Sequence, residues 1–180
     1  MNIVRLVKKA KKGNKEALLQ LIMEDKDSYY RLAVSYMGNA HDAMDAMEDM
    51  IVKIYEKINQ LKKEEAFYSW SKTILVNSCK TMLRKKKNIV LIDDWNEQEA
   101  EISHALTSNP YMNSVHQMDI QEMLLHLNKH QKEAIQLKYF HDMDYQSIAT
   151  LTNVSLGTVK SRIFQGLKKL RELHGGEWSE

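Results

Sequence analysis

The sequence predicts an all-α protein made of two small helical domains joined by a flexible acidic linker. Glycine and proline are scarce, with six and one in 180 residues, against an average usage of about 7% and 5%. Helix-favouring Met, Leu, Lys, Glu and Ala are common instead, and apolar residues recur at steps of three and four. A turn-rich β-sandwich or barrel is therefore excluded, and a hydrophobic content of 43% excludes a disordered chain.

Cysteine usage and the apolar runs predict a cytoplasmic protein without direct membrane insertion. Cys79 is the only cysteine, which leaves neither an internal disulfide nor a Cys-based zinc site. No apolar run approaches the roughly 18 residues of a membrane-spanning helix. The basic N-terminus is not followed by the apolar stretch of a secretory signal.

The first domain is predicted over residues 1–87 and contains four helices. Two short apolar faces and one long one define the first three, with members Ala17, Leu18, Leu21 and Ile22, then Leu32, Ala33 and Tyr36, then Met47, Ile51, Ile54, Ile58 and Leu61. Gly38-Asn39 separates the second helix from the long one over 41–61, as expected of a helix stop. The fourth helix places Ile74, Leu75, Ser78 and Met82 inward and ends in the basic run 84–87.

An aromatic cluster precedes that fourth helix and its basic end. Phe67, Tyr68 and Trp70 could stack on unpaired bases while the lysines and arginine bind phosphates. The alternative is that Phe67 and Trp70 anchor the core and the basic run is a solvated helix end. The residues alone leave both interpretations open.

Residues 88–114 are predicted to link the two domains. Residues 93–115 contain five acidic residues and no lysine or arginine, and they include the single proline, Pro110. No helical period continues through this stretch. The alternative, a long surface loop within one domain, is disfavoured because structureless loops beyond about 15 residues are uncommon in compact domains.

The second domain, over 115–175, contains a predicted helix-turn-helix at 145–164. Ile148 and Leu151 face inward, Asn153 suits the left-handed turn position, and Ser155 can cap the second helix. The buried stripe of that helix is predicted to be Val159, Ile163, Gly166, Leu170 and Leu173. Its outward face is polar and basic, as expected of a helix that reads the major groove of DNA. An ordinary helical hairpin with a charged surface is the alternative.

Enzymatic sites find no support in the residues. His126 and His130 are spaced like metal ligands, but the Glu that a metalloprotease helix needs after the first His is Leu127 here. Glu101 and His104 form one Glu-x-x-His motif where a di-iron site needs two. Phosphate-binding glycine loops and nucleophile motifs are also missing from the sequence, so we expect a non-enzymatic protein without a metal or cofactor.

Two blocks of residues, over about 14–87 and 117–173, resemble the extracytoplasmic-function (ECF) group of RNA polymerase sigma factors in the sigma-70 family. The first block matches at Tyr30-Arg31-Leu32-Ala33, Gly38-Asn39, Asp42-Ala43, Asp45-Ala46, Lys53, Tyr55, Phe67-Tyr68-x-Trp70, Ile74, Val76-Asn77 and Leu83-Arg84-Lys85. The second matches at Leu127, Gln131, Tyr139-Phe140, Tyr145, Ile148-Ala149 and the run from Val154 to Arg162. The last run is the most specific.

The resemblance implies three functional surfaces. The long helix is expected to bind the clamp helices of the largest polymerase subunit through Asp45, Glu48, Asp49 and Lys53. The 61–87 segment is expected to capture a flipped base of the single-stranded −10 promoter element, with Leu61, Phe67, Tyr68, Trp70, Asn77, Lys80, Arg84 and Lys85 in this site. The helix-turn-helix is expected to read the duplex −35 element through Thr158, Lys160, Ser161, Arg162, Phe164, Gln165, Lys168 and Lys169.

The resemblance also implies partners: RNA polymerase core, including its flap region, promoter DNA, and an anti-sigma factor that covers the same surfaces. The sequence departs from the family pattern at three places. Glu48 stands where Gln is frequent, Ser71-Lys72 replaces a more apolar pair, and Gln165-Gly166 replaces a frequent Arg and Ala. The other function considered is a free-standing helix-turn-helix regulator with an N-terminal sensing or dimerisation bundle. It is disfavoured because a regulator needs no base-stacking segment beside a basic helix end.

Overall fold

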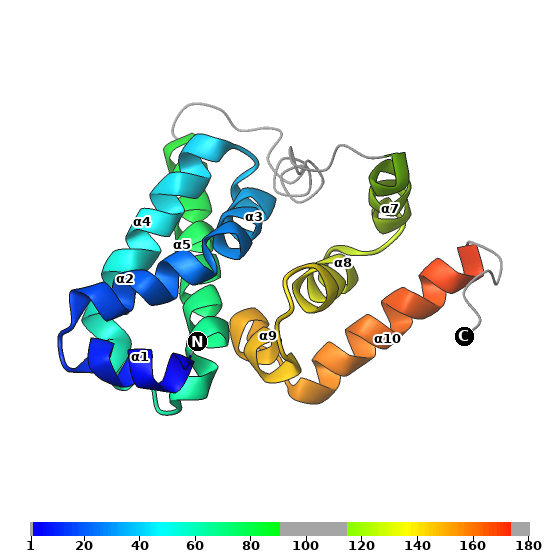
Figure 1. The fold of residues 1–180 in the computed structure, drawn as a ribbon. Coiled ribbons are helices and arrows are strands. Elements are labelled where there is room, and N and C mark those ends of the chain that lie inside the picture. Colours follow the sequence, from blue (N-terminus) through cyan, green and yellow to red (C-terminus); the bar gives the residue numbers. More distant parts are fainter. Residues whose placement is uncertain (1, 91–114, 174–180) are drawn as a thin grey trace. The chain divides into compact units, whose positions relative to one another are not determined.

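The structure is a computed structural model that describes residues 2–90 and 115–173, and these residues are helical with short turns and contain no strand. The chain divides into two compact units, residues 1–109 and 110–180 (Figure 1). Two all-α units confirm the predicted fold class. Residues 91–114 of the predicted linker lie outside the described residues, together with Glu101, His104 and Pro110.

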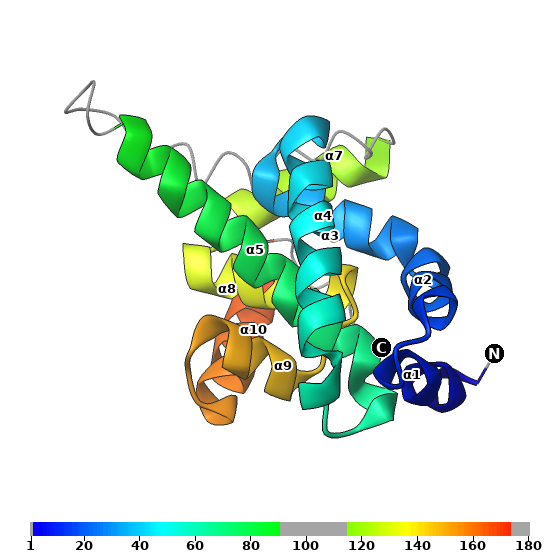
Figure 2. The ribbon, with the colours of Figure 1, turned by 90° about the vertical axis from the view of Figure 1, so that its left-hand side faces the viewer.

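Over its described residues 2–90, the N-terminal unit contains five α-helices: α1 (Ile3–Lys11), α2 (Lys15–Glu24), α3 (Lys26–Met37), α4 (Ala40–Lys57) and α5 (Phe67–Val90). Two 3-10 turns, η1 (Ile58–Gln60) and η2 (Glu64–Ala66), connect α4 to α5. Helices α3, α4 and α5 pack against one another, and α1 packs against α2 and both 3-10 turns. Figure 2 shows α4 crossing α5. The sequence predicted four of these helices, and α1 is an additional one.

Asparagine side chains begin three of the helices. The Oδ1 atoms of Asn2, Asn14 and Asn39 accept hydrogen bonds from backbone N–H groups three residues later, at 3.1, 2.8 and 2.8 Å. These bonds satisfy donors that a helix start leaves without an intrahelical partner. Gly38 ends α3 in the left-handed region, with φ 76°, where glycine has no Cβ penalty. The predicted stop at Gly38-Asn39 is therefore confirmed.

The core of the N-terminal unit is formed by Tyr29, Leu32, Met50, Ile54, Phe67 and Leu75, all fully buried. The predicted apolar stripe of α4 is wrong at one position. Ile51 is 37% exposed, while Met50 is completely buried. At 3.6 residues per turn both lie near the apolar side, and packing against α3 and α5 decides which of them is covered. Ile74 and Met82, also predicted to face inward, are half-buried.

The C-terminal unit contains α7 (Val115–Leu125), α8 (Lys129–Ile135), a π-helical turn η3 (Gln136–Phe140), α9 (Tyr145–Thr152) and α10 (Leu156–Leu173). A capping box between Asn128 and Gln131 starts α8, so His126 and His130 do not lie on one continuous helix. Leu137, Met143, Ile148, Val159 and Ile163 form the core.

Helix α10 packs against α8 and α9, and this packing corrects the predicted buried stripe of α10. Val159, Ile163 and Gly166 are buried, but Leu170 is half-buried and Leu173 is 48% exposed. A Cβ atom built on Gly166 would lie 2.6 Å from Ile135 Cδ1 and 3.3 Å from Gln131 Cβ. The missing side chain at Gly166 therefore lets α10 pass close to α8.

Candidate functional site

Helices α9 and α10 form the predicted helix-turn-helix, and three polar residues set its geometry. Asp144 caps α9, with its Oδ1 accepting from Ser147 N at 2.8 Å. Asn153 turns the chain in the left-handed region, with φ 54° and ψ 47°. Ser155 Oγ accepts from Thr158 N at 3.1 Å and so starts α10. The turn and cap that the sequence predicted are therefore confirmed.

The environment of Asp144 favours the ionised form of its carboxyl group. Desolvation raises the pKa of the carboxyl group, but hydrogen bonds from the backbone and side chain of Ser147 outweigh it and hold the pKa below its ordinary value. The Ser147 hydroxyl donates to Oδ2 at 2.7 Å. A carboxylate at a helix N-terminus is also favoured by the helix dipole.

The outward face of α10 carries all eight residues predicted to read duplex DNA. Lys160, Ser161, Phe164, Gln165, Lys168 and Lys169 are exposed, and Thr158 and Arg162 are half-buried. Phe164 is 69% exposed, so its ring is accessible to a partner. Residues of α10 from 156 to 170 include no acidic side chain. Groups that can reach base edges and groups that can bind phosphate therefore share one surface.

Two residues missed by the sequence analysis join this surface. Lys138 Nζ lies 4.7 Å from the ring centroid of Tyr145, and Lys160 Nζ lies 5.9 Å from the same centroid. Lys138 lies on η3 and Lys160 on α10. Cation–π contacts with the ring of Tyr145 therefore place two lysines from different elements close together. Tyr145 belonged to the family pattern, but no local signal pointed to Lys138.

The aromatic cluster at the start of α5 divides into a core part and an accessible part. Phe67 is completely buried, with Tyr68 and Trp70 at ring-centroid distances of 5.5 and 6.2 Å. Leu61 is also buried, at 5% exposure. Phe67 and Leu61 therefore belong to the hydrophobic core under the accessible residues, which agrees with the predicted apolar face that includes Leu61 and with the core role left open for Phe67.

Tyr68 and Trp70 are half-buried and remain candidates for contact with bases. The hydroxyl oxygen of Tyr68 is buried and has no hydrogen-bond partner among the described residues. Burial, followed by the charges of Asp25 and Glu24, raises the pKa of the Tyr68 phenol. The adjoining Ser71 and Lys72, where the family has a more apolar pair, are buried. Ser71 Oγ is 2.6 Å from Tyr29 Oη, and Lys72 Nζ is 3.4 Å from Asp25 Oδ2.

Asn77, Lys80 and Arg84 follow one side of α5, at steps of three and four residues. Asn77, Arg84 and Lys85 are exposed and Lys80 is half-buried, with Nζ 5.9 Å from the ring centroid of Tyr36. The structure therefore brings the predicted polar residues of this segment to the surface.

The basic end of α5 is partly neutralised. Lys86 Nζ donates to Asp42 Oδ2 at 2.5 Å. Hydrogen bonds from Asn39 and then from Lys86 hold the pKa of Asp42 below its ordinary value. Within the run 84–87, Lys86 is thus paired with Asp42 on α4. The other three members, Arg84, Lys85 and Lys87, make no ion pair among the described residues.

The four residues predicted to bind polymerase lie on α4, but not in equivalent environments. Asp45 and Glu48 are exposed. Asp49 and Lys53 are half-buried and form an ion pair at 2.5 Å, and Lys53 Nζ also donates to Ser78 Oγ at 3.1 Å. Desolvation raises the pKa of Asp49. Hydrogen bonds from Lys53 and Ser78, together with the charges of Lys53 and Lys85, outweigh this effect and hold the pKa below its ordinary value. This pair therefore helps to attach α4 to α5.

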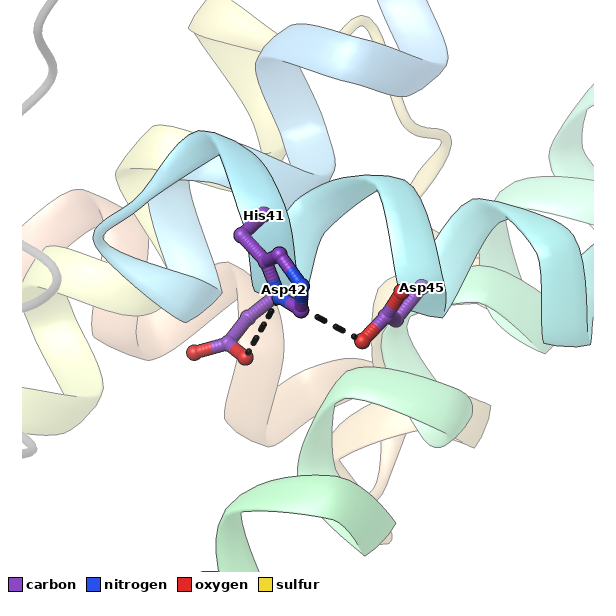
Figure 3. A group of neighbouring side chains, drawn as sticks. All are labelled: His41, Asp42 and Asp45. Atoms are coloured by element: carbon purple, nitrogen blue, oxygen red, sulfur yellow. Dashed lines mark ion pairs between the residues drawn. The ribbon is translucent and has the colours of Figure 1, made fainter.

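His41, Asp42 and Asp45 form a surface cluster at the start of α4 (Figure 3). His41 Nδ1 lies 3.7 Å from Asp42 Oδ1 and 3.5 Å from Asp45 Oδ2. Their ligand atoms are close enough for a cation, but Asp42 already accepts hydrogen bonds from Asn39 and Lys86. His41 is also highly exposed. We therefore interpret the cluster as an ion-pair network.

No helix in the described parts of the chain has the length and apolar character needed to span a membrane.

Two all-α units, one carrying a helix-turn-helix with a basic outward face, define a DNA-binding protein of two helical domains. Residues 21–89 match the family description "Sigma-70 region 2" and residues 117–170 match "Sigma-70, region 4". The chain is 32% identical over 163 residues to RNA polymerase sigma factor SigV of Bacillus subtilis strain 168. The alignment covers 91% of this chain and 94% of SigV. It is 28% identical over 190 residues to the ECF sigma factor SigW of the same organism, covering 96% of both. The chain belongs to the ECF group of sigma-70 family RNA polymerase sigma factors.

Solved structures share the fold. CnrH, solved in complex with the cytosolic domain of CnrY, aligns with a TM-score of 0.64 at 19% identity, covering 97% of this chain and 98% of CnrH. The sigma factor RpoE of Bartonella quintana, solved with the anti-sigma factor NepR, aligns with a TM-score of 0.63 at 22% identity, covering 88% and 96%. As a sigma factor, this protein acts in promoter-specific initiation of transcription with RNA polymerase core.

Proposed function

We propose that this sigma factor assigns core binding and promoter melting to its N-terminal unit and duplex recognition to its C-terminal unit. In core binding, α4 docks on the clamp helices of the largest polymerase subunit. Asp45 and Glu48 are the direct contacts, since both are exposed and the contact of Asp45 with the exposed His41 does not connect α4 to another helix. Asp49 and Lys53 hold α4 against α5 and so keep that surface in place.

In melting, the accessible side of α5 binds the non-template strand of the −10 element. Asn77 offers hydrogen bonds to a flipped base, and Arg84 and Lys85 bind phosphates. Tyr68 and Trp70 offer aromatic surface at the start of the helix, where stacking is worth about 1–3 kcal/mol per base. Phe67 and Leu61 support this surface from below.

In duplex recognition, α10 enters the major groove of the −35 element with its N-terminal half. The observation that carries the proposal is the outward face of α10: Thr158, Ser161, Arg162 and Gln165 share one side, and Val159 and Ile163 are buried on the other. Lys168 and Lys169 continue along the helix and bind phosphates. Lys138 and Tyr145 extend the phosphate-binding surface onto η3 and α9.

Regulation by an anti-sigma protein is part of the proposal. Two proteins of the same fold were solved as complexes: CnrH with the cytosolic domain of CnrY, and RpoE with the anti-sigma factor NepR. Exposed apolar side chains on α2 and α4, among them Leu19, Val52 and Tyr55, offer a surface that either polymerase or such an inhibitor covers. The C-terminal unit binds the polymerase flap, and the protein works in the cytoplasm without catalysis of its own.

Transcription in vitro tests the proposal. Purified full-length protein is added to sigma-free core polymerase with a library of bacterial promoter fragments, and the start sites are mapped. The expected result is a discrete set of transcripts that share two short elements upstream of the start site and disappear without the protein. Sequence-specific binding to duplex DNA without core, together with no transcript in its presence, would instead establish the free-standing regulator.

A further inference from the structure

One side chain of α1 holds both ends of the connection between α4 and α5. Lys11 Nζ donates to the carbonyl oxygen of Leu61 at 2.7 Å and to Glu64 Oε1 at 2.8 Å. The side chains of Lys11 and Glu64 are 20% and 22% exposed. These bonds join positions 50 and 53 residues apart in the sequence, and α1 packs directly against η1 and η2.

We call the two bonds from Lys11, to Leu61 and to Glu64, the Lys11 bridge; it spans a very short piece of chain. Leu61 ends η1, where its own N–H bonds to Ile58 O at 3.2 Å, and Glu64 begins η2, which leads into α5. Lys62 and Lys63 lie between the two bridged residues and are exposed. Fixing Leu61 and Glu64 therefore fixes the backbone that carries these two lysines.

The charges of this connection also follow from the bridge. The hydrogen bond from Lys11 is the main cause that lowers the pKa of Glu64 below its ordinary value, so Glu64 stays ionised and balances Lys11. Lys62 and Lys63 form no ion pair among the described residues, and the neighbouring Glu65 is exposed. The outer surface of the connection is consequently positive.

We infer that Lys11 is a positioning residue that keeps the 61–64 connection closed, so that Lys62 and Lys63 bind phosphates of the single-stranded promoter DNA. The inference rests on the proposed function, in which the segment that begins at residue 61 meets the melted −10 strand. A loop already fixed in its bound form loses less conformational entropy on binding. Lys11 lies before residue 21, outside the matched region 2, so the family match assigns it no role.

A substitution at Glu64 distinguishes positioning of the lysines from simple electrostatic attraction to DNA, because the two models predict opposite changes in DNA affinity. If the connection acts through its net charge alone, Glu64→Gln removes a negative charge near DNA and tightens binding. If the bridge positions the lysines, Glu64→Gln weakens binding although the surface becomes more positive. Glu65→Gln is the matched control, since Glu65 is an exposed neighbour with the same charge, and the bonds of Lys11 in this connection go to Leu61 and Glu64 instead.

The experiment uses holoenzyme assembled from full-length protein and core polymerase, with promoter DNA premelted over the −10 element. The dissociation constant is measured at several salt concentrations. Glu64→Gln and Lys11→Met should each weaken binding about two- to five-fold, as expected for a partly exposed ion pair. The double variant should be no weaker than Lys11→Met, because Lys11→Met already removes both bonds. Neither single variant should change the salt dependence, whereas Lys62→Met with Lys63→Met should reduce it by about 0.7 per lost phosphate contact.

Control variants separate positioning from loss of fold or of charge. Lys9→Met removes an exposed lysine from the same helix and should leave binding to premelted DNA within two-fold of wild type, and circular dichroism should show unchanged helix content in every variant. Glu64→Gln that binds like Glu65→Gln, or additive losses in the double variant, would overturn the inference. Wild-type holoenzyme that initiates at no promoter would overturn the proposed function and this inference with it. Active wild type with an unaffected Lys11→Met variant would overturn the inference alone.

Discussion

The ammonium group of Lys53 lies 2.5 Å from the carboxylate of Asp49, one turn earlier on α4. Lys53 also donates to Ser78 on α5, so the pair connects two helices of the N-terminal unit. Asp45 and Glu48, on the same helix, have no such duty in the described structure beyond the contact of Asp45 with the exposed His41. Charge reversals at these positions should therefore separate polymerase binding from folding.

Asp45→Arg should weaken binding to core polymerase about tenfold or more while the unfolding temperature stays near that of wild type. Asp49→Arg should lower the unfolding temperature as well, because it breaks the pair with Lys53 and adds a like charge near Lys53 and Lys85. Binding is measured by fluorescence anisotropy of labelled protein with core, and unfolding by circular dichroism. Glu24→Arg is the control, because it reverses an exposed charge in the last turn of α2, where a cation suits the helix dipole. Equal core affinity for wild type and Asp45→Arg would remove Asp45 from the interface.

Asn77→Ala should impair open-complex formation more than closed-complex binding. A pocket for a flipped base matters after the strands separate, and the loss of a polar contact there corresponds to roughly a three- to thirty-fold effect. Permanganate reactivity of unpaired thymines reports the open complex, and a filter-binding measurement at low temperature reports the closed one. Asn88→Ala, which removes an exposed amide near the far end of the same helix, should match wild type. Unchanged thymine reactivity in Asn77→Ala on duplex promoter DNA would exclude the residue from melting.

Gln165→Arg should shift base preference toward guanine at one position of the −35 element. Glutamine pairs best with adenine N6 and N7, whereas arginine binds guanine O6 and N7, and a good bidentate contact discriminates by about 1–3 kcal/mol. Lys168→Ala should weaken binding to every sequence alike, because a phosphate contact carries no base information. Binding-site selection with wild-type and variant holoenzymes measures both effects. Identical base preferences for wild type and Gln165→Arg would show that Gln165 reads no base.

Asp144 should make the stability of the C-terminal unit depend on pH. Its folded-state pKa is lowered, so its stabilising effect is complete above the ordinary carboxyl value of about 3.9 and is lost as the pH falls through the folded value. Asn caps helices equally well but does not titrate. The stability difference between wild type and Asp144→Asn should therefore change below about pH 4 and stay constant above it, and Asp144→Ala should cost about 1 kcal/mol at pH 7.

Urea unfolding of the full chain across this pH range measures the effect of Asp144. Asp142→Asn is the control, since Asp142 is exposed and its φ of 51° suits Asn as well as Asp. Parallel pH profiles for wild type and Asp144→Asn, in both pH ranges, would contradict the prediction.

Local sequence signals were sufficient for much of this molecule. The turn at Asn153, the helix stop at Gly38-Asn39 and the cap at Ser155 were predictable because each depends on φ/ψ preferences and hydrogen bonds within about four residues. The recognition face of α10 was predictable for a related reason, since a helix with one apolar side must expose the other. Two blocks of matching residues also identified the family before any packing was known.

The residues that the sequence alone placed wrongly are those whose environment depends on distant segments. Periodicity shows which side of a helix is apolar, but it does not show which neighbour covers it. Ile51 is therefore exposed and Met50 buried, and only packing shows that Phe67, for which the sequence left a core role and a base-stacking role open, lies in the core. Lys11 lies on a helix that was not predicted, and only the fold places its ammonium group between Leu61 and Glu64. Contacts across 50 residues leave no periodic trace in the sequence, because they are set by how α1 packs against the turns that join α4 and α5.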